Sequence, residues 1–170
     1  KLNLSNNLSA MFSGQKMEIE VQITLWEPKL LSLSEEVITS RTNVQNRNIR
    51  QILGHLVDSA TNNTHRIIHL QNLESPLTFP NYASNGNNDR WIAIQNYNDE
   101  DWFDLVQLWK YSLKHYCHVV ENVDESKLEN EWVAGPERLI SLRKMINDFF
   151  PHLQLHLKEI DELLHSNPLE

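Results

Sequence analysis

Apolar residues recur with the period of an α-helix in three long segments of the chain: 48–73, 99–122 and 141–165. Residues that commonly cap a helix N-terminus stand at or just before the start of each segment; these are Asn48, Asn98 and Ser141. Each segment therefore predicts an amphipathic helix that buries one face and exposes the other.

The N-terminal part of the chain is less regular. "KMEIEVQITL", residues 16–25, alternates apolar and polar residues as a strand does, whereas "WEPKLLSLSEEV", residues 26–37, follows a helical pattern. Because no second strand pattern is available to pair with the first, the region is predicted to be helical and interrupted near Pro28. The polar residues 1–15 are predicted to form a flexible arm, and residues 16–170 a single domain.

Two long connections join the later helical segments. "SPLTFPNYASNGNNDRWIAIQNY", residues 75–97, is predicted to be mostly loop with a short helix over 89–96. "DESKLENEWVAGPERLI", residues 124–140, is predicted to be loop because Gly135 and Pro136 interrupt it. Four amphipathic helices with such connections predict an all-α protein, a four-helix bundle with long connecting loops. The facing helices of such bundles commonly build metal or ligand sites.

Composition narrows the class of protein. The net charge is -8, and the 15 Lys and Arg residues form no basic stripe, which argues against nucleic acid as a partner. No apolar run approaches the roughly 20 residues of a membrane span, and the N-terminus lacks a signal-peptide pattern. The single cysteine, Cys117, excludes an intrachain disulfide, suits a reducing compartment and falls on the apolar side of its helix. A cytoplasmic protein with Cys117 in its core is therefore predicted.

Two histidines lie four residues apart in "FFPHLQLHLKEI", residues 149–160. Residues at this spacing share one face of a helix, so His152 and His156 can ligate a single metal ion. A pair of hydrogen-bonded histidines at the edge of the core fits the same spacing. The H-E-x-x-H sequence of metalloproteases is absent, since Leu153 follows His152.

The segment 48–73 carries a polar stripe that faces either water or a polar cavity. The stripe consists of His55, Ser59, Asn62, Arg66 and His69. His65 lies at its edge, four residues before His69, and these two histidines offer a rival pair of ligands. His115 and His118 lie opposite the apolar stripe of their own helix, so both are predicted to face solvent.

"IRQILGHLVDSATNNTHRIIHLQ", residues 49–71, and "DFFPHLQLHLKEI", residues 148–160, together resemble the DinB/YfiT-like proteins. The block "DRWIAIQNYNDEDWFDLVQLW" between them is a further shared feature. This family of four-helix bundles includes bacillithiol S-transferases. Its pattern is one histidine in the second helix followed by an H-x-x-x-H pair in the last. The resemblance implies that His55, His152 and His156 hold a divalent metal ion.

The resemblance implies that three neutral imidazoles hold this ion, which is preferably zinc or nickel. The ion keeps its positive charge and lowers the pKa of a bound water or thiol, which serves hydrolysis or nucleophilic transfer respectively. A metal-dependent hydrolase or a thiol S-transferase is therefore expected, with a small-molecule substrate and a low-molecular-weight thiol as candidate partners. Asn62, His65 and Arg66 are candidate catalytic residues beside the metal, and Arg66 would suit an anionic substrate group.

Two other hypotheses stay open at this point. A non-catalytic stress-response protein of the DNA-damage-inducible type would bind a metal or ligand without turning it over. Alternatively, the histidines have lost their role and the bundle only dimerises; a homodimer is predicted because amphipathic bundles often pair. The chain departs from the family pattern at Arg47, where many members have a tryptophan, and at Pro151, directly before His152.

Overall fold

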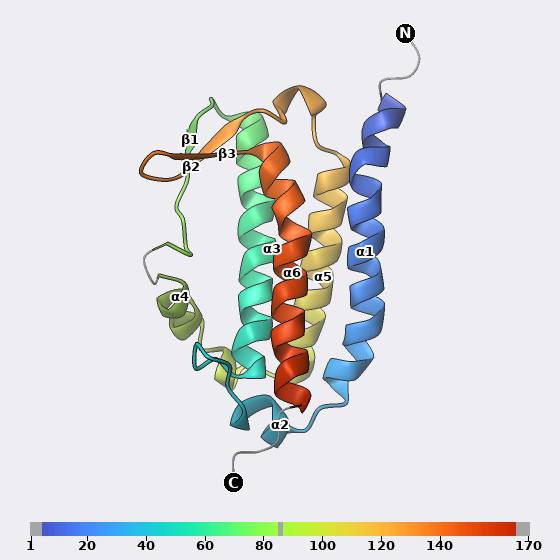
Figure 1. Cartoon of the computed structure of the whole chain (residues 1–170), viewed down its shortest axis with the longest axis vertical. Helices are drawn as coiled ribbons and strands as arrows, with labels where there is room; N and C mark the ends of the chain where they lie inside the picture. The colour runs from blue at the N-terminus through green and yellow to red at the C-terminus, as the bar shows by residue number, and fades with distance from the viewer. Residues whose placement is uncertain (1–4, 85–86, 166–170) are drawn as a thin grey trace.

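Four long helices lie side by side in the computed structural model, which describes residues 5–84 and 87–165, with side chains from residue 12 onward (Figure 1). The helices are α1 (Ser5–Leu31), α2 (Glu35–Ser40), α3 (Ile49–Asn72), α4 (Asn87–Gln95), α5 (Trp102–Glu121) and α6 (Leu142–His165). The strands are β1 (Leu77–Thr78), β2 (Glu131–Gly135) and β3 (Arg138–Ser141). Helices α1, α3, α5 and α6 form the bundle, so the predicted all-α four-helix architecture is confirmed.

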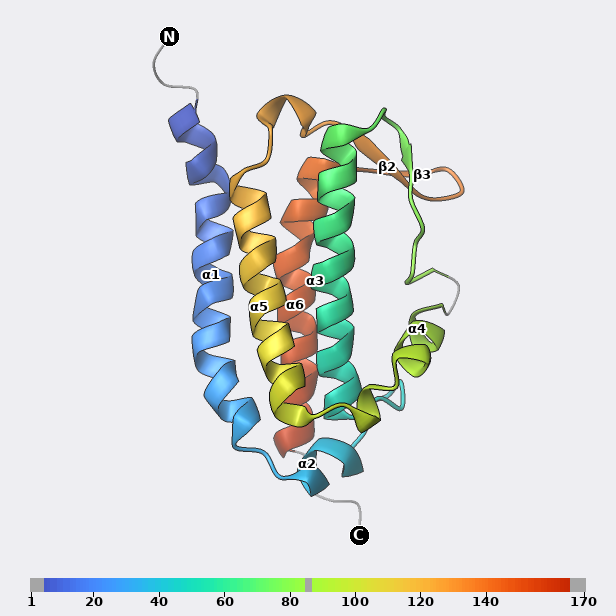
Figure 2. The same cartoon turned by 180° about the vertical axis from the view of Figure 1, so that it is seen from behind.

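The order of the helices in space requires one long return of the chain. Helices α1 and α6 run in one direction, and α3 and α5 run in the other (Figures 1 and 2). Because α3 and α5 follow one another in this order and run parallel, the connection 73–101 must travel back along the whole bundle. Both views show this connection, which carries β1 and α4, passing along the outer side of α3. This return segment lies over part of the polar stripe of α3, since its Tyr82 and Phe79 rings lie 6.3 and 5.3 Å from the rings of His55 and His69.

Helix α1 runs through Pro28 without a break, so the interruption predicted there is wrong. A proline removes one backbone hydrogen bond from a helix. Ile23 and Leu30 on either side of Pro28 are both buried, and their packing offsets that loss. Helix α1 also includes residues 5–15, where the sequence predicts a flexible arm, while residues 1–4 lie outside the described residues.

The predicted loop 124–140 contains a β-hairpin, which corrects the sequence prediction. Strands β2 and β3 pair antiparallel with Trp132 opposite Ile140, and β1 joins β2 in parallel with Leu77 opposite Trp132. The Trp132 Nε1 donates a hydrogen bond to the Phe79 carbonyl at 3.1 Å, and its ring is buried. Strands of two to five residues are too short to show a diagnostic alternation in sequence. The sheet closes one end of the region beside α3 (Figure 1).

Helix α5 begins at Trp102 and not near residue 99 as predicted. Asp101 is its N-cap and accepts a hydrogen bond from the Asp104 backbone N–H at 3.0 Å. Asn98, the predicted cap, instead accepts a hydrogen bond from the Asn48 side chain at 2.9 Å. The residues before the helix therefore tie α5 to the start of α3.

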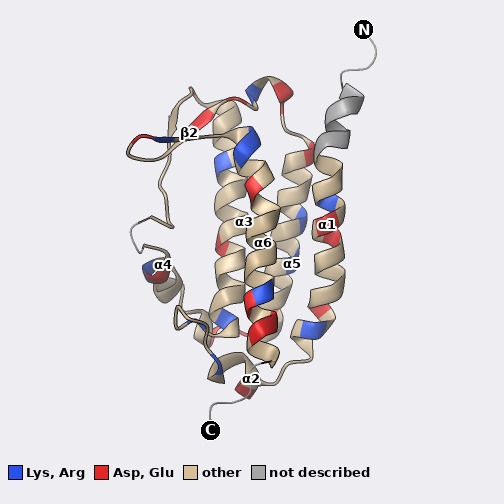
Figure 3. Ribbon diagram, viewed as in Figure 1, with Lys and Arg blue, Asp and Glu red and all other residues tan. Residues whose placement is uncertain are grey.

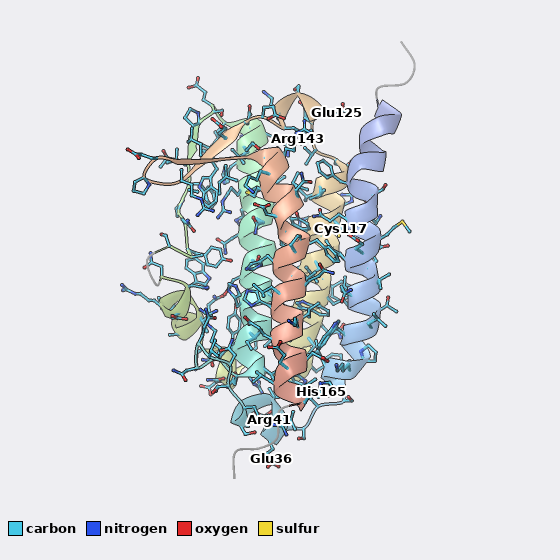
Figure 4. The ribbon with its side chains drawn as sticks, in the orientation of Figure 1. Glu36, Arg41, Cys117, Glu125, Arg143 and His165 are labelled. Atoms are coloured by element: carbon cyan, nitrogen blue, oxygen red, sulfur yellow. The ribbon has the colours of Figure 1, made fainter. Side chains whose placement is uncertain are left out.

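The core runs along the whole bundle. Trp109 is fully buried, and the rings of Tyr116 and Phe149 stack with their centroids 3.7 Å apart. Cys117 is buried, as predicted, on the side of α5 that faces α1 (Figure 4). Burial raises the pKa of its thiol to about 12, so Cys117 is a core residue and not a nucleophile.

The C-terminal end of α6 is held by the segment that precedes α3. Arg41 Nη1 donates hydrogen bonds to the carbonyl oxygens of Leu163 and Leu164, at 2.7 and 3.0 Å. Such terminal carbonyls have no partner within their own helix. Arg41 and His165 accordingly lie at the same end of the molecule (Figure 4).

Asn48 is expected to stabilise the start of α3 through a capping box. Its Oδ1 accepts from the Gln51 N–H at 2.9 Å, and its own N–H donates to Gln51 Oε1 at 3.1 Å. Asn48→Ala should lower the free energy of unfolding by about 1–2 kcal/mol, measured by urea denaturation. Asn48→Asp keeps the acceptor and should recover most of that loss. Equal stability of wild type and Asn48→Ala would show that the cap does not position α3.

Lys and Arg are not gathered on one helix of the described chain (Figure 3). Lys and Arg are interspersed with Asp and Glu along the described chain, as the net charge of -8 implies (Figure 3). Several opposite charges pair across elements, such as Lys110 with Glu27 at 2.8 Å. No helix in the described part of the chain is long and apolar enough to cross a membrane.

Candidate metal centre

Three histidines from two helices converge in the interior of the bundle. His55 comes from α3, and His152 and His156 come from successive turns of α6. One nitrogen of each ring lies within 4.8 Å of the others, and in the described residues these three form the one such group of potential ligands. His55 and His156 are 2% and 7% exposed, whereas His152 is only partly buried, so the cluster is covered except on the His152 side. Packing of α3 against α6 thus brings together residues about 100 positions apart in the sequence.

The geometry of the cluster fits a tetrahedrally coordinated ion. The Nε2 atoms of His152 and His156 are 3.1 Å apart. Two nitrogens that each lie about 2.0–2.1 Å from one tetrahedral ion are separated by about 3.3 Å. The His55 ring is edge-on to both, with centroids 4.6 Å from His156 and 5.4 Å from His152. Small movements of the side chains would bring all three nitrogens to bonding distance of a common point.

Glu159 orients the His156 ring. Its Oε2 lies 2.9 Å from His156 Nδ1 and also accepts a hydrogen bond from the Asn43 side chain at 3.2 Å. A carboxylate on Nδ1 fixes the proton there, so the lone pair of Nε2 points into the cluster. Residues 156 and 159 lie one turn apart on α6, which places the carboxylate beside the ring.

Glu159 is therefore expected to tune metal affinity without touching the metal. Glu159→Ala should weaken Zn²⁺ binding by about 10–100-fold, and Glu159→Gln by less, because the amide oxygen can still accept from Nδ1. Competition with a chromophoric chelator measures both. Glu162→Ala is the matched control, since Glu162 is exposed on the same helix and pairs with Lys158. Unchanged affinity in Glu159→Ala would contradict the orienting role.

Ser59 performs the corresponding role for His152. Its Oγ lies 3.3 Å from His152 Nδ1, and the Asn63 side chain donates to the Ser59 carbonyl at 2.8 Å and contacts Oγ at 3.4 Å.

Helix α6 continues through Pro151, which leaves His152 and His156 one turn apart with ring centroids at 4.5 Å. The proline therefore does not displace the pair from its shared face.

The environment keeps two of the rings neutral. Burial, with smaller contributions from the other two histidines, lowers the pKa of His55 to about 2. Burial and the neighbouring His156 lower the pKa of His152 to about 4. Neutral imidazole is the form that binds metal, so no proton has to be removed from these rings at neutral pH.

The return segment places aromatic and polar side chains over His55. The Tyr82 ring lies 6.3 Å from the His55 ring and 5.7 Å from Trp91 of α4. Burial raises the pKa of Tyr82 to about 12, so it keeps its proton at neutral pH. The Asn88 amide favours the protonated form of His55, although His55 Nδ1 makes no hydrogen bond of good geometry in the described chain. Neither Tyr82 nor Asn88 shows a periodic signal in sequence, so sequence reasoning missed both.

Asp58 supports α3 and does not reach the histidines. Its Oδ1 accepts hydrogen bonds from the Tyr97 hydroxyl and the Gln95 amide, both at 2.7 Å. Burial raises the pKa of the Asp58 carboxyl. Tyr97 packs directly over Gly54, next to His55 in sequence. These contacts of Asp58 anchor the return segment to α3.

A cavity of about 540 Å³ opens beside the cluster. Its lining combines polar and aromatic side chains from α3, α6, the return segment and the hairpin, and includes His152, Ser59, Arg66, Tyr82 and Trp132. A pocket of this size accommodates a small molecule.

The three candidate catalytic residues, Asn62, His65 and Arg66, do not lie together in the structure. Arg66 is buried and lines the large cavity. The Asn62 side chain donates to the Asp58 carbonyl at 2.9 Å and is not part of the cavity wall. His65 is exposed and lines a separate hollow of about 150 Å³ with His115. A one-residue change along a helix rotates a side chain by about 100°, which separates His65 from its neighbour Arg66.

The remaining histidines lie outside the cluster. His69 packs near Phe79, with ring centroids 5.3 Å apart, so the rival pair of His65 and His69 does not form a ligand group with other described residues. His115 and His118 are exposed on α5, as predicted. The histidines brought together are those on the inward side of α3 and α6.

The fold is the YfiT type of four-helix bundle, which confirms at the level of the fold the resemblance seen in the sequence. A solved structure with this fold is YfiT from Bacillus subtilis, described as "a probable metal-dependent hydrolase with an unusual four-helix bundle topology". It matches with a TM-score of 0.73 and 14% identity, over 88% of this chain and 84% of that chain. At this identity the likeness shows the fold alone. No family model and no curated protein matches the sequence.

Proposed function

We propose that the protein is a metal-dependent hydrolase of small molecules, and that His55, His152 and His156 hold one divalent ion. The convergence of three imidazole nitrogens within 4.8 Å, beside a cavity of about 540 Å³, carries the proposal. The description of YfiT as "a probable metal-dependent hydrolase" supports the same reading. Imidazole ligands suit zinc and nickel, the two ions predicted from the sequence.

The roles of the side chains follow from their positions. A divalent ion on three neutral imidazoles acts as a Lewis acid and lowers the pKa of a coordinated water. Glu159 and Ser59 hold the rings of His156 and His152 in place through their Nδ1 atoms. Tyr82, protonated at neutral pH, offers an O–H donor on the cavity wall for a substrate oxygen. The aromatic lining limits the access of bulk water.

The proposal is tested by hydrolysis of a panel of carboxylic esters, amides and phosphoesters. Zinc-loaded protein should turn over at least one class, EDTA treatment should abolish turnover, and restoring zinc should recover it. His152→Ala, treated in the same way, should stay inactive. Turnover that persists after chelation would refute the metal-dependent mechanism, and no turnover across the panel would favour a non-catalytic metal-binding protein.

A thiol S-transferase is the second candidate, because the same neutral ligand set would lower the pKa of a coordinated thiol. Cys117 cannot supply the thiol, since it is buried with its pKa raised to about 12. A free low-molecular-weight thiol would therefore be the nucleophile. Incubating zinc-loaded protein with such a thiol and an alkyl halide separates the two functions: thioether formation above the uncatalysed rate favours the transferase.

The homodimer and the cytoplasmic location stay predictions. Helix α1 exposes apolar side chains four residues apart on one face, Met17, Val21 and Leu25, which are 66%, 53% and 60% exposed. A dimer would be expected to cover them. Sedimentation velocity of the wild type and of Val21→Lys measures whether this face associates.

A further inference from the structure

Arg66 is a buried cation in the wall of the cavity. It projects from α3 seven residues beyond Ser59, about 10 Å along the helix axis. Its side chain is 4% exposed, and the guanidinium carbon lies 3.5 Å from the centroid of the Trp132 ring and 5.5 Å from that of Phe79. Both are cation–π contacts, and the closer one places the guanidinium over the Trp132 ring.

The guanidinium lacks partners for most of its hydrogen-bonding groups. Its Nη1 reaches Asn63 Oδ1 at 3.4 Å and Met145 Sδ at 3.7 Å, and both of these contacts are long. Its Nε and Nη2 are buried and make no hydrogen bond to any described residue. Buried donors of this kind are normally satisfied. Nε and Nη2 lie on one edge of the guanidinium, the edge that binds an oxyanion through two parallel N–H bonds.

Arg66 also lacks a counter-charge. Burial lowers the pKa of its guanidinium to about 10, so the group stays charged at neutral pH. No carboxylate pairs with it among residues 12–84 and 87–165. Asp148 lines the same cavity, but it is exposed and is engaged by Lys144 at 2.8 Å. Arg138, at the outer edge of the cavity, adds a second positive charge. The cavity is therefore locally positive in a protein whose net charge is -8.

A continuous row of polar side chains joins Arg66 to the histidines. His152 contacts Ser59, Ser59 contacts Asn63, and Asn63 contacts Arg66, at 3.3, 3.4 and 3.4 Å. The residues on α3 follow at spacings of four and three, so they share one face of the helix. One molecule lying along this face would contact both ends of the row.

We propose that Arg66, stacked on Trp132, is the binding site for an oxyanion, a carboxylate or a phosphate, carried by the small molecule that reacts at the histidine cluster. The substrate is then an anionic compound whose charged group and reacting atom lie at the two ends of this row of side chains. The link to the reaction rests on the proposed function; the oxyanion site itself does not.

The site is tested with inorganic phosphate and with benzoate as separate probes, by titration calorimetry on the full chain after EDTA treatment. Chelation removes any anion binding by metal. At least one probe should bind saturably, and Arg66→Gln should weaken it by at least about tenfold, the loss of a charge-assisted bidentate contact. The probe that binds more tightly distinguishes phosphate from carboxylate. Arg90→Gln, which removes an exposed arginine of α4, is the matched control and should leave binding within about threefold of the wild type.

Each outcome decides the proposal. Arg66→Lys keeps the charge but loses the pair of parallel N–H donors on Nε and Nη2. This variant should therefore bind the anion with intermediate affinity. Retained Zn²⁺ binding by both variants shows that they are folded. Equal anion affinity in Arg66→Gln and the wild type would overturn the oxyanion site. So would the failure of the wild type to bind either probe when each is raised to 20-fold above a Kd of about 1 mM. A wild type that binds the anion but not zinc would refute the proposed hydrolase and leave this site standing.

Discussion

His152→Ala is expected to weaken Zn²⁺ binding by more than about 100-fold. This loss is larger than the one expected when a residue that hydrogen-bonds a metal ligand is removed. The variant deletes one of three nitrogens in the only ligand group found among the described residues. Two imidazoles remain, and they cannot complete the three-ligand arrangement that such a site requires. Competition with a chromophoric chelator at fixed pH measures the change.

The matched control for this experiment is His118→Ala. His118 is exposed on α5 and lies outside the cluster, so its removal should leave both the affinity and the stoichiometry unchanged. Circular dichroism on the metal-free variants shows whether either substitution unfolds the bundle. Full-strength zinc binding by a folded His152→Ala protein would place the metal elsewhere and remove the basis of the proposed chemistry.

Gly54→Ala is expected to lower the free energy of unfolding by about 3 kcal/mol, at the upper end of the usual cost of overpacking. A methyl group on Gly54 would overlap the aromatic ring of Tyr97. If the Tyr97 ring moves away, its hydroxyl loses the 2.7 Å hydrogen bond to Asp58 Oδ1. The buried Asp58 carboxyl then has one hydrogen-bond donor fewer, which adds to the cost. Urea denaturation in the presence of EDTA measures the effect without contributions from metal.

Gly14→Ala is the control for Gly54→Ala. Gly14 lies in α1 with no atom within 4 Å of the position that a Cβ would occupy. Replacing a helical glycine by alanine at such a site stabilises a protein by up to about 1 kcal/mol. The same substitution should therefore have opposite signs at the two positions. A neutral Gly54→Ala would mean that the return segment does not pack on α3 as described.

The helices of the bundle could be predicted because they depend on local periodicity, whereas the grouping of the three histidines was implied by the family resemblance. Periodicity puts His152 and His156 on one face of segment 141–165 at the edge of the core, and it leaves His55 in a polar stripe that faces either water or a cavity. The packing of α3 on α6 brings the three together. The same periodicity places His115 and His118 on the solvent side of α5. Periodicity therefore separates exposed histidines from those at the edge of the core, while the shared site depends on how α3 and α6 pack.

The elements that escaped prediction are stabilised by contacts distant in sequence. The hairpin of β2 and β3 is anchored where Trp132 packs under Arg66, a contact that no local pattern encodes. Tyr82 reaches the cluster because the return segment packs along α3. The hydrogen bond from the Tyr97 hydroxyl to Asp58 helps to hold the segment there. His65 was grouped with Arg66 because the edge of a polar stripe is poorly defined by periodicity alone.

The proposed metal centre is tested most directly by X-ray diffraction from zinc-loaded crystals, with data collected on both sides of the zinc absorption edge. An anomalous difference peak is expected at one point that lies about 2.0–2.1 Å from a nitrogen of each of His55, His152 and His156. Its height should fall on the low-energy side of the edge. A peak that instead lies at exposed histidines such as His115 or His118, with none among the three converging rings, would contradict the account.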